Sequence, residues 1–158
     1  ESLKYVKYKN YKLLILGSAL NELEIKTEYQ EEIEKNVKEI SDRVIFTGFI
    51  KYDEINKFYA LADIAVLPSI WNDPAPLTIV ESLVSGLPII TTNSGGIPEY
   101  ATNGSAIILQ NNEKIVQNLS KSIDYLLNNP LELEKMKIKR CFQKFNVGKL
   151  LVRLCKYY

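Results

Sequence analysis

The sequence predicts an α/β fold, in which a Rossmann-like parallel sheet carries helices on both faces. Short continuous apolar runs, typical of strands buried on both faces, alternate with longer amphipathic segments along the 158 residues. Turn residues, glycine and proline above all, separate the two kinds of segment. No linker, repeat or low-complexity stretch interrupts this order, so we expect residues 1–158 to form one domain.

Three apolar runs in the first half of the chain predict the first strands. KLLILG (12–17) stops at a glycine, RVIFTGF (43–49) follows a charged segment, and DIAVLPS (63–69) is closed by Pro68. Runs of this length, rich in Val, Ile, Leu and Phe, are typical of strands in a parallel sheet. Because helices are predicted between them, we expect these strands to be parallel.

Two amphipathic helices are predicted between these strands. Over 27–40, apolar residues recur at spacings of three and four, with charged residues between them. Over 54–61, Phe58 and Tyr59 lie on a common apolar face, and Asp53 is expected to cap the start of the helix. Both segments therefore support the alternation of strand and helix.

The second half of the chain continues the same alternation. Pro76 suits the first turn of a helix that runs from Leu77 to the break at Gly86. LPIITT (87–92) predicts a strand, and a glycine-rich turn follows it. The remaining apolar patterns predict a short strand at 106–109 and three helices, at 113–128, 131–145 and 148–157.

The composition excludes several classes of function. Lys and Arg number 20 against 19 Asp and Glu, so the net charge of +1 lacks the basic excess typical of nucleic-acid binders. The chain has no histidine, which removes Ser-His and Cys-His nucleophile pairs and the commonest metal ligand. Cys141 and Cys155 are too few for a disulfide framework or a zinc site and are expected to be reduced thiols.

The sequence shows neither a membrane span nor an export signal. No apolar run approaches the roughly 18 residues of a spanning helix, and ESLKYVKYKN at the N-terminus does not resemble a signal peptide. We therefore expect a cytoplasmic protein. The first residue is not methionine and the opening residues have the spacing of a truncated helix, so we treat the chain as a fragment of a larger protein.

The stretch WNDPAPLTIVES (71–82) carries the strongest functional signal. Asp73 lies in a loop ahead of a predicted helix, and Glu81 lies about one turn inside it. The N–H groups of Leu77 and Thr78 have no partner within the helix and lie at the positive end of its dipole, which favours a phosphate. A carboxylate can accept two sugar hydroxyls at once. The residues thus suggest a ligand with a central diphosphate and a polyol at each end, such as a nucleotide sugar.

Several motifs in order resemble the C-terminal half of a GT-B fold, specifically the retaining glycosyltransferases of family 4 and the glycogen-synthase-like group. In that family a carboxylate, seven residues and a glutamate precede an Ala/Ser-x-x-x-G-x-P turn. Here Asp73, Glu81 and SLVSGLP (82–88) follow that order. FTGFIKYDEINKFYALADIAVLPS lies before this motif and PIITTNSGGIPE after it. The resemblance covers roughly residues 12–128 and is far more specific than a lone glycine motif.

The resemblance implies a role for the residues of the central motif. Glu81 would hold ribose hydroxyls of the donor nucleotide, and Asp73 would hold hydroxyls of the transferred sugar. The backbone N–H groups of Leu77 and Thr78 would hold the diphosphate. The parent enzyme would move a sugar from a nucleotide-diphosphate donor to a glycan or a lipid-linked acceptor.

Positions outside the central motif also receive roles from the resemblance. Backbone groups of Phe49 and Ile50 would meet the base. Gly95 and Gly96 would either shape the sugar pocket or only supply the φ values of a tight turn. The resemblance implies no metal and no other cofactor, because such enzymes stabilise the leaving diphosphate with side chains and a helix terminus.

The chain departs from the family pattern in three ways. The first carboxylate is usually glutamate, and Asp73 is shorter by one methylene. Pro76 stands where many members have glycine and removes one N–H donor. Every charged side chain from 58 to 113 is acidic, although this segment should hold a diphosphate. In the family an Arg and a Lys near the start of the C-terminal domain contact the phosphates, and this chain begins after that point.

A missing N-terminal domain of the same enzyme is therefore the expected partner. It would carry the acceptor site and the remaining catalytic groups, so the fragment by itself would be inactive. Membrane contact, at the inner face, would come only through the full-length enzyme.

Other functions and plainer interpretations stay open. A nucleotide-sugar epimerase shares the fold, and a non-catalytic module could bind a nucleotide or a partner on a degenerate site. A dinucleotide oxidoreductase is disfavoured because KLLILGSALNEL lacks the G-x-G-x-x-G spacing. Asp73 before proline is also ordinary turn chemistry, and Glu81 could be a solvated helix residue. Trp71 could stack on a sugar or pack at the rim of the loop.

Overall fold

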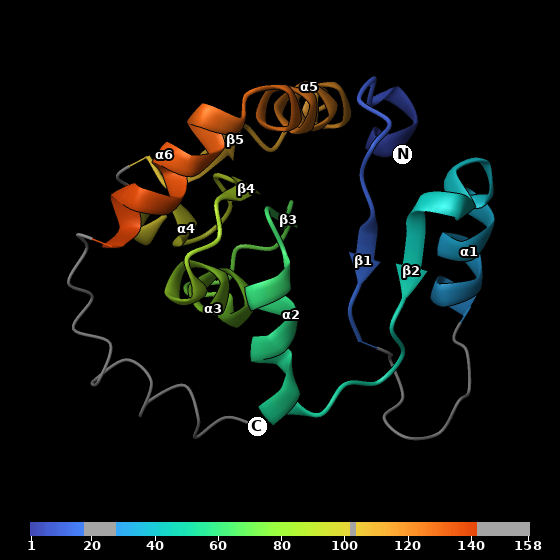
Figure 1. Cartoon of the computed structure of the whole chain (residues 1–158), viewed down its shortest axis with the longest axis horizontal. Coiled ribbons are helices and arrows are strands. Elements are labelled where there is room, and N and C mark those ends of the chain that lie inside the picture. Colours follow the sequence, from blue (N-terminus) through green and yellow to red (C-terminus); the bar gives the residue numbers. More distant parts are fainter. Residues whose placement is uncertain (18–27, 102–103, 142–158) are drawn as a thin grey trace.

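A computed structural model describes residues 1–17, 28–101 and 104–141 of the chain. Strands and helices alternate along these residues, and every pair of named strands is parallel (Figure 1). The predicted α/β fold with parallel strands is confirmed. The strands form two sheets, of two and three strands, where the sequence predicted one.

The larger sheet contains three strands in the order β3-β4-β5. β3 (Ala65–Leu67) and β5 (Ala106–Leu109) lie on either side of β4 (Ile89–Thr92), which is buried along its whole length. A central strand must find apolar partners on both faces. The run LPIITT supplies side chains for both faces because neighbouring residues point in opposite directions.

Helices cover both faces of this sheet. Ile90 points into a core formed with α5 (Ile115–Asn128) and α6 (Pro130–Cys141). Its neighbour Ile89 points into a second core, formed with α3 (Leu77–Ser85) and the short α4 (Ile97–Tyr100). Each fully buried isoleucine contributes about 1.5–3 kcal/mol relative to an exposed one. Figure 1 shows the two helix layers on opposite sides of β3 and β4.

The smaller sheet pairs β1 (Leu13–Ile15) with β2 (Val44–Phe46). In the described ranges no ladder joins β1 to β3. The N-terminal segment attaches the small sheet to the rest of the molecule instead, because Val6 is fully buried in the core beside α5 and Tyr11 packs against it. Side-chain packing of this segment, and not a strand pairing, therefore joins the two sheets in the described residues.

The helices beside the small sheet differ from their predicted bounds. The helix predicted at 27–40 is α1 (Glu28–Asn36) followed by the 3₁₀ helix η2 (Lys38–Arg43), with non-helical backbone at Ile40. Another 3₁₀ turn, η1, covers Ser2–Tyr5 at the N-terminus. None of the helices in the described ranges has the length and apolar run needed to cross a bilayer.

The helix predicted at 54–61 is the 3₁₀ turn η3 (Tyr52–Glu54) followed by α2 (Ile55–Leu61). Asp53 was wrongly predicted to cap this helix. Its backbone lies inside η3, one residue too early for the N-cap. Glu54 holds the N-cap position of α2, and its side chain makes no capping bond to the described residues. The predicted helix at 148–157 and Cys155 lie outside the described residues, as do the last residues of the helix predicted at 131–145.

Candidate functional site

The candidate site lies where β3 and β4 end. In a parallel sheet the loops after the carboxyl ends of neighbouring strands form the usual ligand crevice. The loop of residues 68–76 follows β3 and leads into α3, and the turn of residues 93–96 follows β4 and leads into α4. Asp73 lies in this loop, and Glu81 follows in the second turn of α3.

Two tyrosine hydroxyls hold the Glu81 carboxylate. Tyr52 donates to Oε1 and Tyr59 donates to Oε2, each at 3.0 Å. Burial of Tyr59 raises its pKa, and the negative charge of Glu81 raises it further. Glu81 is therefore not the solvated helix residue of the plain interpretation, because both of its oxygens have fixed protein donors.

Asp73 forms a turn of its own. Its Oδ1 accepts the backbone N–H of Ala75 at 2.8 Å, an Asx turn of the kind that aspartate before proline favours. Among the described residues no donor meets its other carboxylate oxygen, and the side chain is exposed. The turn role of Asp73 thus leaves one oxygen available for a ligand.

The two glycines after β4 lie against the backbone of that loop. The N–H of Gly96 donates to the Asp73 carbonyl at 3.1 Å, and the N–H of Gly95 donates to Oδ1 of Asn72 at 3.2 Å. Gly95 has φ of +56°, and a Cβ there would overlap the Asp73 carbonyl oxygen. A Cβ at Gly96 would overlap the carbonyl oxygen of Pro74 in the same way. Glycine is therefore required here to bring the Asp73 loop and the β4–α4 turn together.

Buried hydroxyl groups fasten these loops to the sheet, and sequence reasoning did not identify them. Ser94 donates to the Ser69 carbonyl at 2.9 Å, and Thr92 also donates to that carbonyl. Asn111, after β5, donates to Ser94 at 3.0 Å. Thr92 and Ser94 are buried, and the run TTNS at the end of an apolar strand was the signal that could have indicated them. The network fixes the loops at the carboxyl ends of all three strands.

Tyr100 lies beneath the same loops on α4. Its hydroxyl is buried and has no hydrogen-bond partner among the described residues. Burial, and then the charges of Asp73 and Glu99, raise the pKa of Tyr100 to about 12. The acidic side chains of the site thus act on Tyr100 as well as on Tyr59.

The start of α3 offers free backbone donors. The N–H groups of Ile79 and Val80 bond to the carbonyl of Pro76 at 3.1 and 3.2 Å, and no side chain of the described residues caps the helix. No acceptor for the N–H of Leu77 or Thr78 occurs in the described part of the chain. These two donors lie at the positive end of the helix dipole, where an anion is stabilised.

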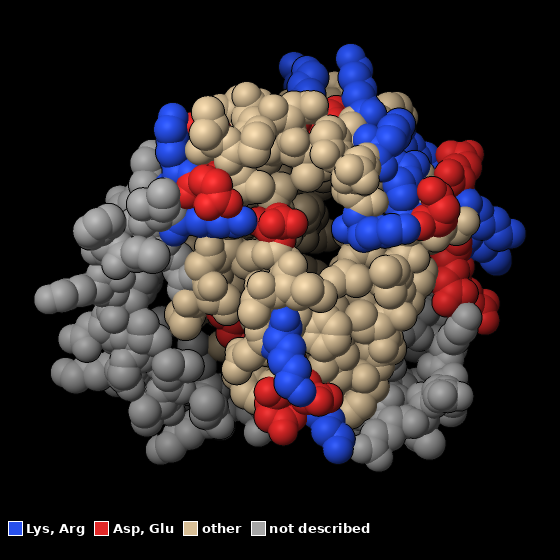
Figure 2. Space-filling model, in the orientation of Figure 1, with Lys and Arg blue, Asp and Glu red and all other residues tan. Residues whose placement is uncertain are grey.

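The part of the site built from residues 58–113, which includes the Asp73 loop and α3, carries no basic side chain. Every charged residue from 58 to 113 is acidic. Figure 2 shows Lys and Arg gathered instead on the side of the molecule that carries η1 and the top of the small sheet. In the described residues no group of three His, Cys, Asp or Glu side chains could hold a metal ion.

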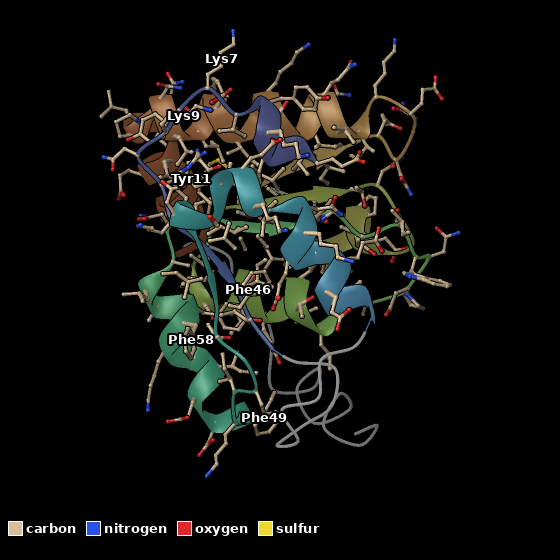
Figure 3. All side chains as sticks on the ribbon, turned by 90° about the vertical axis from the view of Figure 1, so that its right-hand side faces the viewer. Lys7, Lys9, Tyr11, Phe46, Phe49 and Phe58 are labelled. Atoms are coloured by element: carbon tan, nitrogen blue, oxygen red, sulfur yellow. The ribbon has the colours of Figure 1, made fainter. Side chains whose placement is uncertain are left out.

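Phe49 and Ile50, predicted at the base, lie in the loop between β2 and η3. Phe49 is exposed and Ile50 half-buried, and in Figure 3 Phe49 lies at the foot of α2, beyond Phe46 and Phe58. No hydrogen bond in the described ranges joins either residue to Glu81. Tyr52, two residues after Ile50, makes that connection through its hydroxyl.

Two of the hollows on the surface of the described residues bear on the choice of site. One, of about 520 Å³, is lined by Trp71, Asp73 and their neighbours, and Trp71 is 79% exposed at its rim. The other, of about 720 Å³, runs between η1 and α5 and is lined by none of the predicted site residues. The smaller hollow is the better candidate because it contains Asp73 and belongs to the loop that leads into α3.

Comparisons with known proteins find relatives in sequence and in fold. Spore coat protein SA of Bacillus subtilis (strain 168) is 40% identical over 63 residues, which are 40% of this chain and 17% of that protein. The GDP-mannose-dependent monoacylated alpha-(1-6)-phosphatidylinositol monomannoside mannosyltransferase of Corynebacterium glutamicum is 28% identical over 130 residues, 78% of this chain and 32% of that protein. The crystal structure of Anabaena Alr3699/HepE in complex with UDP matches with a TM-score of 0.78 at 21% identity, over 98% of this chain and 42% of that one.

The chain therefore spans less than half the length of these relatives. The predicted resemblance and its place in the C-terminal half of a GT-B fold are confirmed by these matches and by a family model. That model, described as "Glycosyl transferases group 1", matches residues 1–141. Since this match includes both sheets, the candidate site and every described residue, the chain belongs to the glycosyl transferases of group 1.

Proposed function

We propose that this chain binds the donor of a glycosyltransferase reaction, a nucleotide-diphosphate sugar. The observation that carries the proposal is the arrangement at the start of α3: two backbone N–H groups, which have no acceptor among the described residues, follow the Asp73 loop and precede Glu81 along the chain. A diphosphate fits the free donors, and each carboxylate fits hydroxyl groups on either side of it. The full enzyme would transfer the sugar to a glycan or a lipid-linked acceptor, with retention at the anomeric carbon.

Each predicted residue then has a specific task. Glu81 would accept hydroxyl donors from ribose, and the free Oδ2 of Asp73 would accept from the transferred sugar. The N–H groups of Leu77 and Thr78 would bind the diphosphate, which explains why a helix terminus lies at the centre of the site. The other four predicted residues would act through their backbone groups. Gly95 and Gly96 would hold the loop on the sugar side in place. Phe49 and Ile50 would contact the base.

The names of related proteins support a donor of this class. Anabaena Alr3699/HepE has been crystallised with UDP and with UDP-glucose. The Corynebacterium glutamicum relative is named as GDP-mannose-dependent. The names of these relatives include a uridine nucleotide and a guanosine nucleotide, so the test must include both bases.

The acidic segment 58–113 has consequences for the whole enzyme. A diphosphate carries negative charge, and a helix terminus contributes only about 1 kcal/mol near the surface. The cationic side chains would come from the N-terminal domain and from residues at its junction with this chain. This chain alone would therefore bind the donor weakly and transfer no sugar. We propose that no metal is needed and that the enzyme works in the cytoplasm.

The test is a chemical-shift titration of the chain with UDP, GDP and the corresponding sugars at millimolar concentration. We expect shifts at Leu77, Thr78 and Glu81 that saturate with one of the two bases and disappear in Glu81→Ala. Shifts confined to the hollow between η1 and α5, or no shifts with any donor, would contradict the proposal.

A further inference from the structure

We propose that Tyr52 and Tyr59 orient the Glu81 carboxylate for two vicinal ribose hydroxyls and so make this site select ribonucleotides over 2′-deoxyribonucleotides. This inference rests on the proposed donor-binding function. It adds two positioning residues, neither of which would touch the reacting atoms.

Tyr59 is the fixed half of this arrangement. It projects from α2, is half-buried, and donates its hydroxyl to Oε2 of Glu81 at 3.0 Å. Burial and the charge of Glu81 raise its pKa, so the hydroxyl keeps its proton and remains a donor throughout the neutral range. The hydrogen bond from a hydroxyl group to a carboxylate is one of the stronger hydrogen bonds in proteins.

Tyr52 is the exposed half. Its side chain is 66% exposed, and it donates to Oε1 of Glu81 at 3.0 Å from the 3₁₀ turn η3. Ile50, in the predicted base loop, lies only two residues ahead of it. Tyr52 therefore ties the loop proposed for the base to the carboxylate proposed for the ribose.

The carboxylate has room for both sets of partners. Its two oxygens offer about four acceptor positions, and the tyrosines occupy one on each oxygen. One position on each oxygen remains, which matches a pair of neighbouring hydroxyls. Without the tyrosines the carboxylate would rotate freely, and binding would have to restrict that rotation.

A purely structural interpretation makes a different prediction. The tyrosines could do no more than fasten η3 and α2 to α3, in which case their loss would weaken binding of every nucleotide equally. Orientation of Glu81 matters most for ligands that carry both hydroxyls, because a ligand with one hydroxyl uses only one of the two oxygens. The ratio of two affinities therefore separates the two interpretations where a single affinity does not.

The experiment compares UDP with 2′-deoxy-UDP, and GDP with 2′-deoxy-GDP, by chemical-shift titration of the 158-residue chain. For the base that binds, we expect the ribonucleotide to bind about tenfold more tightly, the effect of one charged hydrogen bond. Tyr59→Phe should reduce this ratio to about two, and Tyr52→Phe should reduce it to a smaller extent because its bond is exposed to water. Tyr125→Phe, an exposed tyrosine on α5, is the matched control and should keep the full ratio.

Failure of this inference can be distinguished from failure of the proposed function. If the unaltered chain binds neither nucleotide, or if Glu81→Gln keeps the full ratio, the proposed role of Glu81 fails and this inference fails with it. If Glu81→Gln abolishes the ratio while both tyrosine variants keep it, only the positioning role is overturned. Thermal unfolding shows whether the Tyr59→Phe variant is folded. If it is not, the affinity ratio of the Tyr52→Phe variant, changed at an exposed position, tests the positioning role.

Discussion

The two sheets of this molecule are built from similar apolar runs, yet only the larger one contains a strand that is buried along its whole length. Every residue of β4 is buried, with Ile89 and Ile90 in different cores. In the small sheet, Ile45 and Phe46 are exposed by 46% and 40%. An apolar run therefore predicts a strand, while its burial depends on whether helices pack over both faces.

This difference also divides the candidate site. Asp73, Glu81 and the two glycines lie on loops that are fixed to the three-stranded sheet by buried hydroxyls. Phe49 and Ile50 lie on a loop of the small sheet, which has fewer buried contacts and is expected to open more readily. The part of the site with Asp73 and Glu81 is thus expected to be more rigid than the loop of Phe49 and Ile50, and Tyr52 bridges the two.

Isoleucine truncation in each sheet tests the comparison most strongly. Ile90→Ala, at a fully buried position of β4, should lower the free energy of unfolding by about 2–5 kcal/mol because it leaves a cavity between the sheet and α5. Ile45→Ala in the small sheet is the matched control and should cost less than about 1 kcal/mol. Urea unfolding measures both. Equal losses would show that the small sheet is as tightly packed as the large one.

The glycines give a second matched pair. Gly95→Ala combines a φ of +56° with overlap on the Asp73 loop, so we expect a loss of about 2–4 kcal/mol and weaker donor binding. Gly48→Ala has a similar φ of +67° but open space around the new Cβ, and should cost about 1–2 kcal/mol. Unfolding curves and donor titrations check both variants. A Gly95→Ala protein as stable as Gly48→Ala would mean that the two loops can move apart.

Alkaline pH should weaken the large-sheet side of the molecule. The ordinary tyrosine pKa is 10.0, and burial raises that of Tyr100 to about 12, ahead of the charges of Asp73 and Glu99. Between these two pKa values, Tyr100 keeps its proton in the folded state and releases it in the unfolded state. Its contribution to the free energy of unfolding is therefore complete below pH 10 and disappears as pH rises towards 12. We expect about 1 kcal/mol after solvent screening. Tyr100→Phe should flatten the fall in stability between pH 10 and about 12, and an unchanged slope would contradict this assignment.

Surface ion pairs should contribute least in either region. Lys137 lies 3.5 Å from Asp63 beside the large sheet, and Lys4 lies 3.8 Å from Glu39 beside the small one. Because these pairs are exposed, Asp63→Asn and Glu39→Gln should each change the free energy of unfolding by less than about 0.5 kcal/mol. Thermal unfolding at low and high salt measures both. A larger effect in one variant would mean that charge, in addition to core packing, separates the two regions.

Local patterns in the sequence predicted much of this structure. The apolar runs at 12–17, 43–49 and 87–92 each contain a strand, and Pro76 and Gly86 mark the start and end of α3. Such signals depend on neighbours within a few residues, so they can be recognised in the sequence without knowledge of the tertiary structure. The order of motifs around Asp73 and Glu81 was equally local and indicated the family.

Contacts between distant segments could not be predicted in this way. The tyrosine donors of Glu81 come from 29 and 22 residues earlier in the chain, and their hydroxyls meet it only because α2 packs beside α3. The need for glycine at 95 and 96 likewise comes from the backbone of residues 73 and 74.

The sequence by itself determined the alternation of strands and helices, the family, and the residues of the central motif. Tertiary structure alone decided that the described strands form two sheets, that two tyrosine hydroxyls hold Glu81, and that one oxygen of Asp73 has no donor among the described residues. The physical reason is the distance along the chain over which each interaction acts. Propensity, capping and turn chemistry act between residues that are close in sequence. Burial, close approach and shared hydrogen bonds depend on which surfaces meet after the chain has folded.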